Sequence, residues 1–186
     1  QVTEYWLSDP RRAIEAQTML YSQFMSVWSN SLQKLGGQEV DDLVKPEKGD
    51  KRFHDEDWSK NAFFDFLKQA YLVTSRWAFD LVDKTENLDD HTRHKAGFYV
   101  QSLANAFSPS NFVLTNPELY KETIAANGQN LVEGMKKLAE DIQAGNGDLK
   151  IRQVDTKPFV IGENIAATPG KVVARSELVE IIQYTP

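Results

Sequence analysis

Residues 8–37 read SDPRRAIEAQTMLYSQFMSVWSNSLQKLGG and predict one long amphipathic helix. Ser8-Asp9 supplies an N-cap, and Pro10 follows at the first helical position, where its missing N–H is not needed. Gly36-Gly37 ends the pattern, because glycine continues a helix poorly. Between these signals, apolar residues recur at spacings of three and four, as on one face of a helix. We therefore expect a helix about 39 Å long, at 1.5 Å per residue over positions 10–35.

The apolar face of this helix is the candidate contact surface of the chain. The opposite face carries Gln, Ser and Asn, and segment 1–36 has as many acidic as basic residues. That balance suits an anionic lipid surface poorly, since helices that bind one usually carry Lys and Arg. Two interpretations stay open: the face packs inside its own domain, or it docks onto a partner helix or an apolar surface. The side chains that we single out for such docking are Tyr21, Phe24, Met25, Trp28 and Leu32.

Composition divides the chain into four segments. Residues 1–36 form the amphipathic helical arm, and residues 37–60 hold eight acidic and five basic residues and predict an acidic linker. We expect the acidic clusters Asp41-Asp42 and Asp55-Glu56-Asp57 to be hydrated. Residues 61–148 predict a helical domain, and residues 149–186 predict β-strands. The fold class is therefore mainly α, a multi-helix N-terminal domain with a short C-terminal β segment.

The helical domain should contain two long helices followed by two shorter ones. The long ones span about 61–84 and 87–107, and the second should present Leu103 and Phe107 to the core. The shorter ones begin after the cap at Asn116 and run to about Gln143.

The C-terminal segment should form strands at 149–151 and 159–161 and a hairpin that turns at Ser176-Glu177. Two or three strands alone make a poor sheet, so we expect the chain to continue past Pro186. It begins with Gln1 rather than Met, and we expect it to be a piece of a longer protein.

The composition excludes several classes of protein. The chain of 186 residues has a formal net charge of −6 and no cysteine. Without cysteine it can form no disulfide, thiolate metal site or cysteine nucleophile. None of its segments is strongly basic, so we expect no nucleic-acid partner. No apolar run approaches the roughly 20 residues that cross a bilayer, so we expect no transmembrane segment.

No motif in the sequence predicts catalytic, cofactor-binding or metal-binding residues. His91 and His94 share a helix face, but a third ligand is missing and the neighbouring Arg93 and Lys95 would repel a cation. The string from Thr168 to Lys171 resembles a phosphate-binding loop, but its glycine spacing is wrong. A Gly-x-Ser-x-Gly elbow is absent. Four asparagines are interpreted as helix caps and turns rather than as catalytic groups; they are Asn111, Asn116, Asn127 and Asn130.

Several strings between Arg52 and Pro186 resemble the N-terminal region of class I polyhydroxyalkanoate (poly-beta-hydroxybutyrate) synthases. The long Ser-Pro-Ser-Asn-Phe and Thr-Pro-Gly strings are the most specific of them. The matching strings are Arg52-Phe53-x-Asp55-x-x-Trp58, Lys68-Gln69-x-Tyr71-Leu72, Ser108-Pro109-Ser110-Asn111-Phe112-x-x-Thr115-Asn116-Pro117-Glu118, Gly128-x-Asn130-Leu131, Gly162-x-Asn164-Ile165-Ala166-x-Thr168-Pro169-Gly170-Lys171-Val172-Val173 and Leu178-x-x-x-Ile182-Gln183-Tyr184-x-Pro186.

The resemblance implies that this chain precedes the catalytic machinery. Synthases of that family are acyltransferases that join (R)-3-hydroxyacyl groups from coenzyme A thioesters into a polyester, with a Cys nucleophile in a Gly-x-Cys-x-Gly elbow, an Asp and a His. That elbow is absent from these 186 residues. The β segment would then begin an α/β-hydrolase-like sheet whose remainder lies in a catalytic domain outside this sequence.

The resemblance also implies partners and a location. In that family the N-terminal region is associated with support of the catalytic domain, with subunit pairing in a homodimer and with polyester granules or granule-associated proteins. We therefore expect a cytoplasmic, granule-associated protein without a cofactor in this region. The alternative is a free-standing helical interaction module at the surface of polymer granules.

Overall fold

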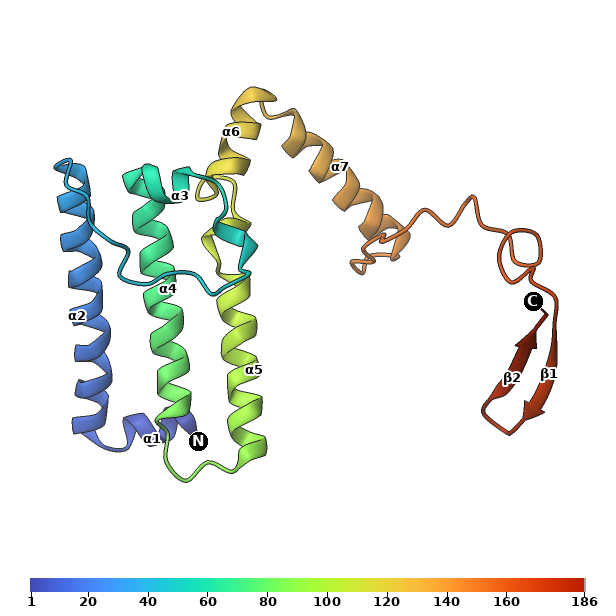
Figure 1. Ribbon diagram of the computed structural model, residues 1–186, viewed down its shortest axis with the longest axis horizontal. Coiled ribbons are helices and arrows are strands. Elements are labelled where there is room, and N and C mark those ends of the chain that lie inside the picture. The colour runs from blue at the N-terminus through green and yellow to red at the C-terminus, as the bar shows by residue number, and fades with distance from the viewer. Residues whose placement is uncertain (186) are drawn as a thin grey trace. The chain divides into compact units, whose positions relative to one another are not determined.

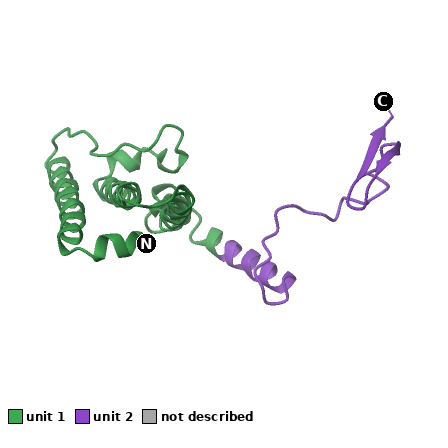
Figure 2. Cartoon of the chain, turned by 90° about the horizontal axis from the view of Figure 1, so that it is seen from below, with its two compact units in different colours: residues 1–131 green, residues 132–186 purple. Residues whose placement is uncertain are grey.

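The computed structural model describes residues 1–185 and divides into two compact units, residues 1–131 and residues 132–186 (Figure 2). Seven α-helices, two short 3-10 helices and a two-stranded antiparallel sheet make up the regular structure of the described residues. This confirms the mainly α class with a short C-terminal β segment. Pro186, the last residue of the family resemblance, lies outside the described residues.

Three long helices form the body of unit 1. Helix α4 (Ala62–Asp83) lies between α2 (Pro10–Leu35) and α5 (Asp90–Ala106), and neighbouring helices run in opposite directions (Figure 1). Each begins at a side-chain cap: Asp9, Asn61 and Asp89 accept a hydrogen bond from a backbone N–H two or three residues later. The sequence prediction of all three helices is confirmed, with boundaries within about three residues.

Two tryptophan side chains fasten the N-terminal part of the chain to α4. Helix α1 (Val2–Leu7), which the sequence analysis did not predict, buries Trp6. Its indole Nε1 donates to Leu81 O at 2.9 Å and to Thr85 Oγ1 at 3.1 Å. The indole of Trp77 on α4 donates to Ala16 O on α2 at 2.9 Å. A buried indole N–H needs such an acceptor, so these contacts fix α1 and α2 along α4.

The segment from 37 to 60 contributes to the core of unit 1. Val44 is buried against Val27 of α2 and Val73 of α4. Gln69 holds Val44 in place: its side chain accepts from the backbone N–H and donates to the backbone carbonyl, both at 3.0 Å. The segment also contains η1 (Lys51–Phe53) and α3 (Asp57–Lys60), whose Trp58 is 1% exposed. Despite its acidic composition, this segment packs against α2 and α4. We call residues 37–60 the strap.

Helix α5 is less buried than its apolar spacing predicts. None of its residues is buried, and Leu103 and Phe107 are 58% and 70% exposed. The prediction that these side chains face the core is wrong. The physical reason is that α5 packs against α4 at one side of unit 1, so much of its circumference meets no other long helix (Figure 1).

Asparagine side chains organise the turns after α5, as expected. Asn111, in η2 (Pro109–Asn111), donates to the carbonyls of Asn105 and Ala106 at the end of α5. Asn116 caps α6 (Pro117–Ala125) by accepting from two backbone N–H groups. Asn127 has a positive φ of 50°, and the Asn130 amide donates to Thr123 Oγ1. The conformation and hydrogen bonding thus confirm the structural roles.

Unit 2 contains most of α7 (Gln129–Ala144) and a hairpin of β1 (Gly170–Arg175) and β2 (Glu180–Tyr184). The strands pair antiparallel with one irregularity between Val172 and Ala174, and the predicted turn is confirmed. The prediction of strands at 149–151 and 159–161 is wrong. Among the described residues, that region holds only an isolated bridge between Ile161 and Ile165. A strand forms only when another strand satisfies its backbone, and residues 1–185 place none beside these segments.

Candidate functional site

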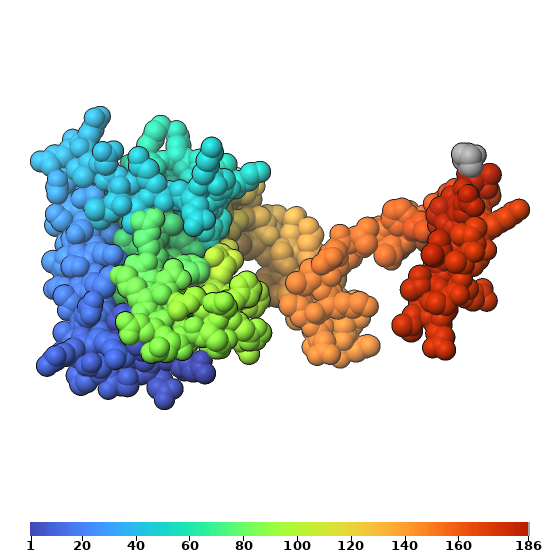
Figure 3. Space-filling view, turned by 60° about the horizontal axis from the view of Figure 1, so that its bottom comes forward, coloured from blue at the N-terminus to red at the C-terminus, as the bar shows by residue number. Residues whose placement is uncertain are grey.

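Five apolar side chains of α2 lie at the surface of unit 1. Tyr21, Met25, Trp28, Leu32 and Phe24 are between 40% and 65% exposed. We call these five residues the α2 surface. They are the candidate contact residues of the sequence analysis, and the structure places all five on one side of the same helix. Figure 3 shows α2 (blue) uncovered along an edge of unit 1.

The α2 surface exists because the apolar arc of α2 is wider than its contact with α4. Ala16, Val27 and Ser31 are the buried residues of the helix. At 100° per residue, Tyr21 and Leu32 lie about 120–140° around the axis from Val27, beyond the reach of α4. One edge of the arc therefore packs inside unit 1 while the rest stays open.

Two aromatic side chains connect the open part of the arc to the packed part. The rings of Phe24 and Trp28 each meet the ring of Phe66 on α4 edge-on, with centroids 6.1 and 5.7 Å apart. Edge-to-face contact is one of the two preferred geometries for aromatic pairs. It holds the two rings in defined orientations while leaving much of each exposed, so this part of the surface is preorganised.

An apolar groove continues the α2 surface toward the end of the helix. Trp28, Leu32 and Leu35 of α2 and Phe63 and Phe66 of α4 line a cavity of about 260 Å³. Leu35 and Phe63 are 69% and 57% exposed at its rim. Apolar concavities of this kind accept aromatic or aliphatic anchors from a binding partner.

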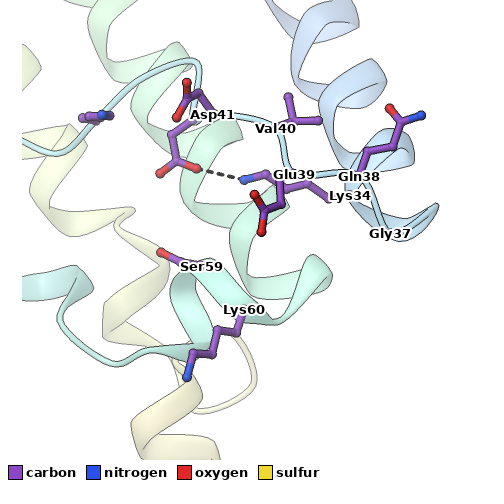
Figure 4. Close-up of a pocket in the computed structure, with 10 residues that line it drawn as sticks. Lys34, Gly37, Gln38, Glu39, Val40, Asp41, Ser59 and Lys60 are labelled. Atoms are coloured by element: carbon purple, nitrogen blue, oxygen red, sulfur yellow. Dashed lines mark hydrogen bonds and ion pairs between the residues drawn. The ribbon is translucent and has the colours of Figure 1, made fainter.

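A network of four charges locks the same end of α2 to the rest of unit 1. Lys34 Nζ lies 2.9 Å from Asp42 and 2.8 Å from Asp65, and Lys68 Nζ lies 2.8 Å from Asp42 and 3.1 Å from Asp65. The side chains of Asp65 and Lys68 are 2% and 3% exposed. The dashed line in Figure 4 is the Lys34–Asp42 pair, beside a polar cavity of about 780 Å³. The network joins α2, the strap and α4, so it fixes the position of the groove.

The prediction that Asp42 is a hydrated charge is wrong, because its carboxylate pairs with Lys34 and Lys68. The other acidic cluster is bound as well: Asp55 and Asp57 lie 2.9 and 3.1 Å from Lys121. One signal could have revealed the network. Asp65 and Lys68 stand three residues apart on the face of α4 that also carries Phe64, and charges on a buried face require partners.

The pKa shifts of Asp42 and Lys34 favour the charged forms of these two groups. Burial disfavours the Asp42 carboxylate, but hydrogen bonds from Lys68 and Lys34 outweigh burial and lower the pKa of Asp42. Burial likewise disfavours the Lys34 ammonium, but hydrogen bonds to Asp65 and Asp42 raise its pKa. Each group is therefore charged over a wider pH range than in an unfolded chain.

We expect the stabilisation by Asp42 to depend on pH. Because its pKa is lower in the folded state, the stabilisation is fully present above the unfolded pKa of about 3.9 and is lost as pH falls through the folded value. In urea unfolding at pH 2.5–8, the loss of stability caused by Asp42→Asn should be constant above about pH 5 and shrink below about pH 4. A loss that is the same at every pH would contradict this role.

The described residues show no arrangement suited to bond chemistry. His91 and His94 are exposed in the first turns of α5, and residues 1–185 contain no cluster of three metal-ligating side chains. Gly170 and Lys171, from the string that resembles a phosphate loop, begin β1. Among the described helices, none has the length and apolar character needed to cross a bilayer.

Comparisons with known proteins connect the chain to one family. The family model described as poly-beta-hydroxybutyrate polymerase (PhaC) N-terminus matches residues 49–186. The chain is 58% identical over 184 residues to the poly(3-hydroxyalkanoate) polymerase subunit PhaC of Rhizobium meliloti, which covers 99% of the chain and 30% of that protein. It is 48% identical over 186 residues to the poly(3-hydroxyalkanoate) polymerase of Methylorubrum extorquens, covering 100% of the chain and 31% of that protein.

More distant polymerases match over less of the chain. The poly(3-hydroxyalkanoate) polymerase subunit PhaC of Cupriavidus necator is 35% identical over 137 residues, which is 74% of the chain and 22% of that protein. The chain thus spans about 30% of the length of the curated relatives that match nearly all of it. No solved structure matches the chain significantly.

Proposed function

Because the chain belongs to the family of poly-beta-hydroxybutyrate polymerase N-termini, we propose that it is the non-catalytic N-terminal region of a polyhydroxyalkanoate synthase. The proposed parent enzyme is an acyltransferase that polymerises (R)-3-hydroxyacyl groups from coenzyme A thioesters and releases coenzyme A. The observation that carries the proposal is the 58% identity over 99% of the chain to a polymerase subunit of Rhizobium meliloti.

The catalytic groups of the proposed reaction lie outside these residues. A synthase of this kind needs a thiolate that takes the acyl group and a base that activates it. The chain has no cysteine that could supply this thiolate. Its contribution to the reaction is therefore structural, through the surfaces that unit 1 presents.

We assign the α2 surface to contact with protein, either the catalytic part of the same enzyme or a second subunit of a homodimer. Exposed Tyr, Trp and Met side chains on a rigid helix are enriched at protein interfaces. The groove beside them offers a pocket for an anchor, and the charge network keeps both helices in register. Because segment 1–36 carries no excess of basic residues, an anionic membrane is the weaker candidate.

The proposal includes a location in the cytoplasm at polyester granules. An apolar surface without charges can also adsorb to a hydrophobic polymer, because the hydrophobic effect is non-directional. Contact with the granule or with granule-associated proteins is thus a second use of the α2 surface.

Release of coenzyme A tests the assignment to a synthase. We expect full-length protein to release coenzyme A from (R)-3-hydroxybutyryl-coenzyme A and to form polymer, whereas residues 1–186 alone should release none above the uncatalysed rate. Thiol titration measures the coenzyme A released by each protein, and substrate without protein is the control. A full-length protein that releases no coenzyme A would leave the free-standing interaction module as the better account, and release by residues 1–186 would overturn the non-catalytic role.

A further inference from the structure

A third cavity of unit 1 is lined by none of the residues of the α2 surface. It measures about 470 Å³ and is enclosed by the strap at 44–52, by α4 and by α5. Small-molecule sites in proteins have volumes of roughly 300–1,000 Å³ and several walls. With this size and three walls, the cavity is better suited than a flat surface to bind a small molecule.

The wall formed by the strap is rigid because Arg52 ties it to both helices. The guanidinium binds both oxygens of Asp50 at 2.8 and 2.9 Å and donates to the Tyr71 hydroxyl at 2.7 Å. That hydroxyl in turn donates to Ala104 O on α5 at 3.0 Å. Hydrogen bonds from the guanidinium to Asp50 and Tyr71 raise the pKa of Arg52, so its charge is fixed.

Three further cations line the cavity without a carboxylate partner. Within residues 1–185, Lys45, Lys48 and Arg76 form no ion pair, although the chain as a whole has a net charge of −6. Glu47 is the carboxylate on the same wall besides Asp50, which Arg52 already holds. Unpaired cations grouped in a cavity of an acidic protein create a local positive potential that attracts anions.

Part of the cavity lining is apolar. Leu72 and Phe79 stand on the same face of α4 as Arg76, and Val44 completes the wall from the strap. A ligand that satisfied both features would carry negative charge at one end and a flat or aliphatic group at the other. Phosphate suits the charged end, since guanidinium and ammonium groups bind it with charge-assisted hydrogen bonds.

We propose that this cavity binds a soluble phosphate-bearing small molecule through Lys45, Lys48 and Arg76, with its apolar group against Phe79 and Leu72. The site is separate from the α2 surface and does not depend on the assignment to a synthase. A nucleoside diphosphate has the required combination of a diphosphate and a flat ring, and ADP is the probe.

Calorimetric titration of residues 1–186 with ADP at low ionic strength tests the site. We expect saturable binding, weaker binding of pyrophosphate and none of adenosine. The variant Lys48→Gln with Arg76→Gln should bind ADP at least tenfold more weakly. The matched control, Lys136→Gln with Lys137→Gln on exposed positions of α7, removes the same charge and should bind ADP as the parent chain does.

Two results would overturn the proposal. One is the absence of saturable ADP binding at millimolar concentration. The other is an equal loss of binding in the α7 control, which would show that ADP responds to net charge rather than to the cavity. The cationic side chains exchanged in both variants are exposed, so thermal unfolding should confirm that each variant stays folded.

Discussion

Replacement of Asp65 by alanine is expected to lower the free energy of unfolding by about 3 kcal/mol, within the 3–5 kcal/mol typical of a broken buried ion pair. The carboxylate is 2% exposed and contacts two ammonium groups, Lys34 at 2.8 Å and Lys68 at 3.1 Å. Without it, Asp42 alone must balance both lysines, and Lys68 has almost no access to water. A buried charge without sufficient compensation is what makes the substitution costly.

Urea unfolding followed by tryptophan fluorescence measures this effect. The control is Glu56→Ala, which removes an ion pair with Lys60 in which both side chains are 70% exposed, and it should change stability little. A loss for Asp65→Ala no greater than for Glu56→Ala would show that the network does not hold unit 1 together.

Replacement of Tyr21, Met25 and Trp28 by serine is expected to weaken association through the α2 surface at least thirtyfold. Truncation of one central Tyr or Trp in an interface commonly costs about 2 kcal/mol or more, and 1.4 kcal/mol is a factor of ten in affinity. Sedimentation of residues 1–186 together with the separately expressed remainder of the proposed synthase measures the first protein contact that we propose. Sedimentation of residues 1–186 alone measures the second, between two copies of this region.

Two controls separate loss of contact from loss of folding. Tyr21→Ser with Met25→Ser leaves the Trp28–Phe66 ring contact intact and should still weaken association. The opposite-face variant Ser22→Ala, Ser26→Ala and Gln33→Ala should associate normally. If the triple serine variant keeps its association, the α2 surface is not the interface.

The long helices could be predicted from sequence because local signals determine their ends. Asp9 and Pro10 begin α2 and Gly36 follows its last residue, so the expected range 10–35 is the observed one. The exposed residues of the α2 surface could likewise be named in advance, although their exposure could not. The neighbouring helix determines how much of an apolar arc is covered. The periodicity of the sequence gives no information on that neighbour.

Features that depend on distant residues escaped prediction. Asp42 and Lys68 are 26 residues apart, and Val44 and Gln69 are 25 apart, so neither contact leaves a mark in a local window. Helices α1 and α3 are too short for a periodic pattern. The strands expected near 149–161 failed for the reverse reason, because apolar β-forming residues there have no partner strand in the described chain.

The most direct test of the central claim is to mix residues 1–186 with the separately expressed remainder of the proposed synthase and to measure sedimentation and release of coenzyme A on the same sample. We predict a complex that releases coenzyme A faster than the remainder does alone, and a loss of both effects with the triple serine variant. Separate sedimentation, together with full activity of the remainder on its own, would contradict a supporting role for this region.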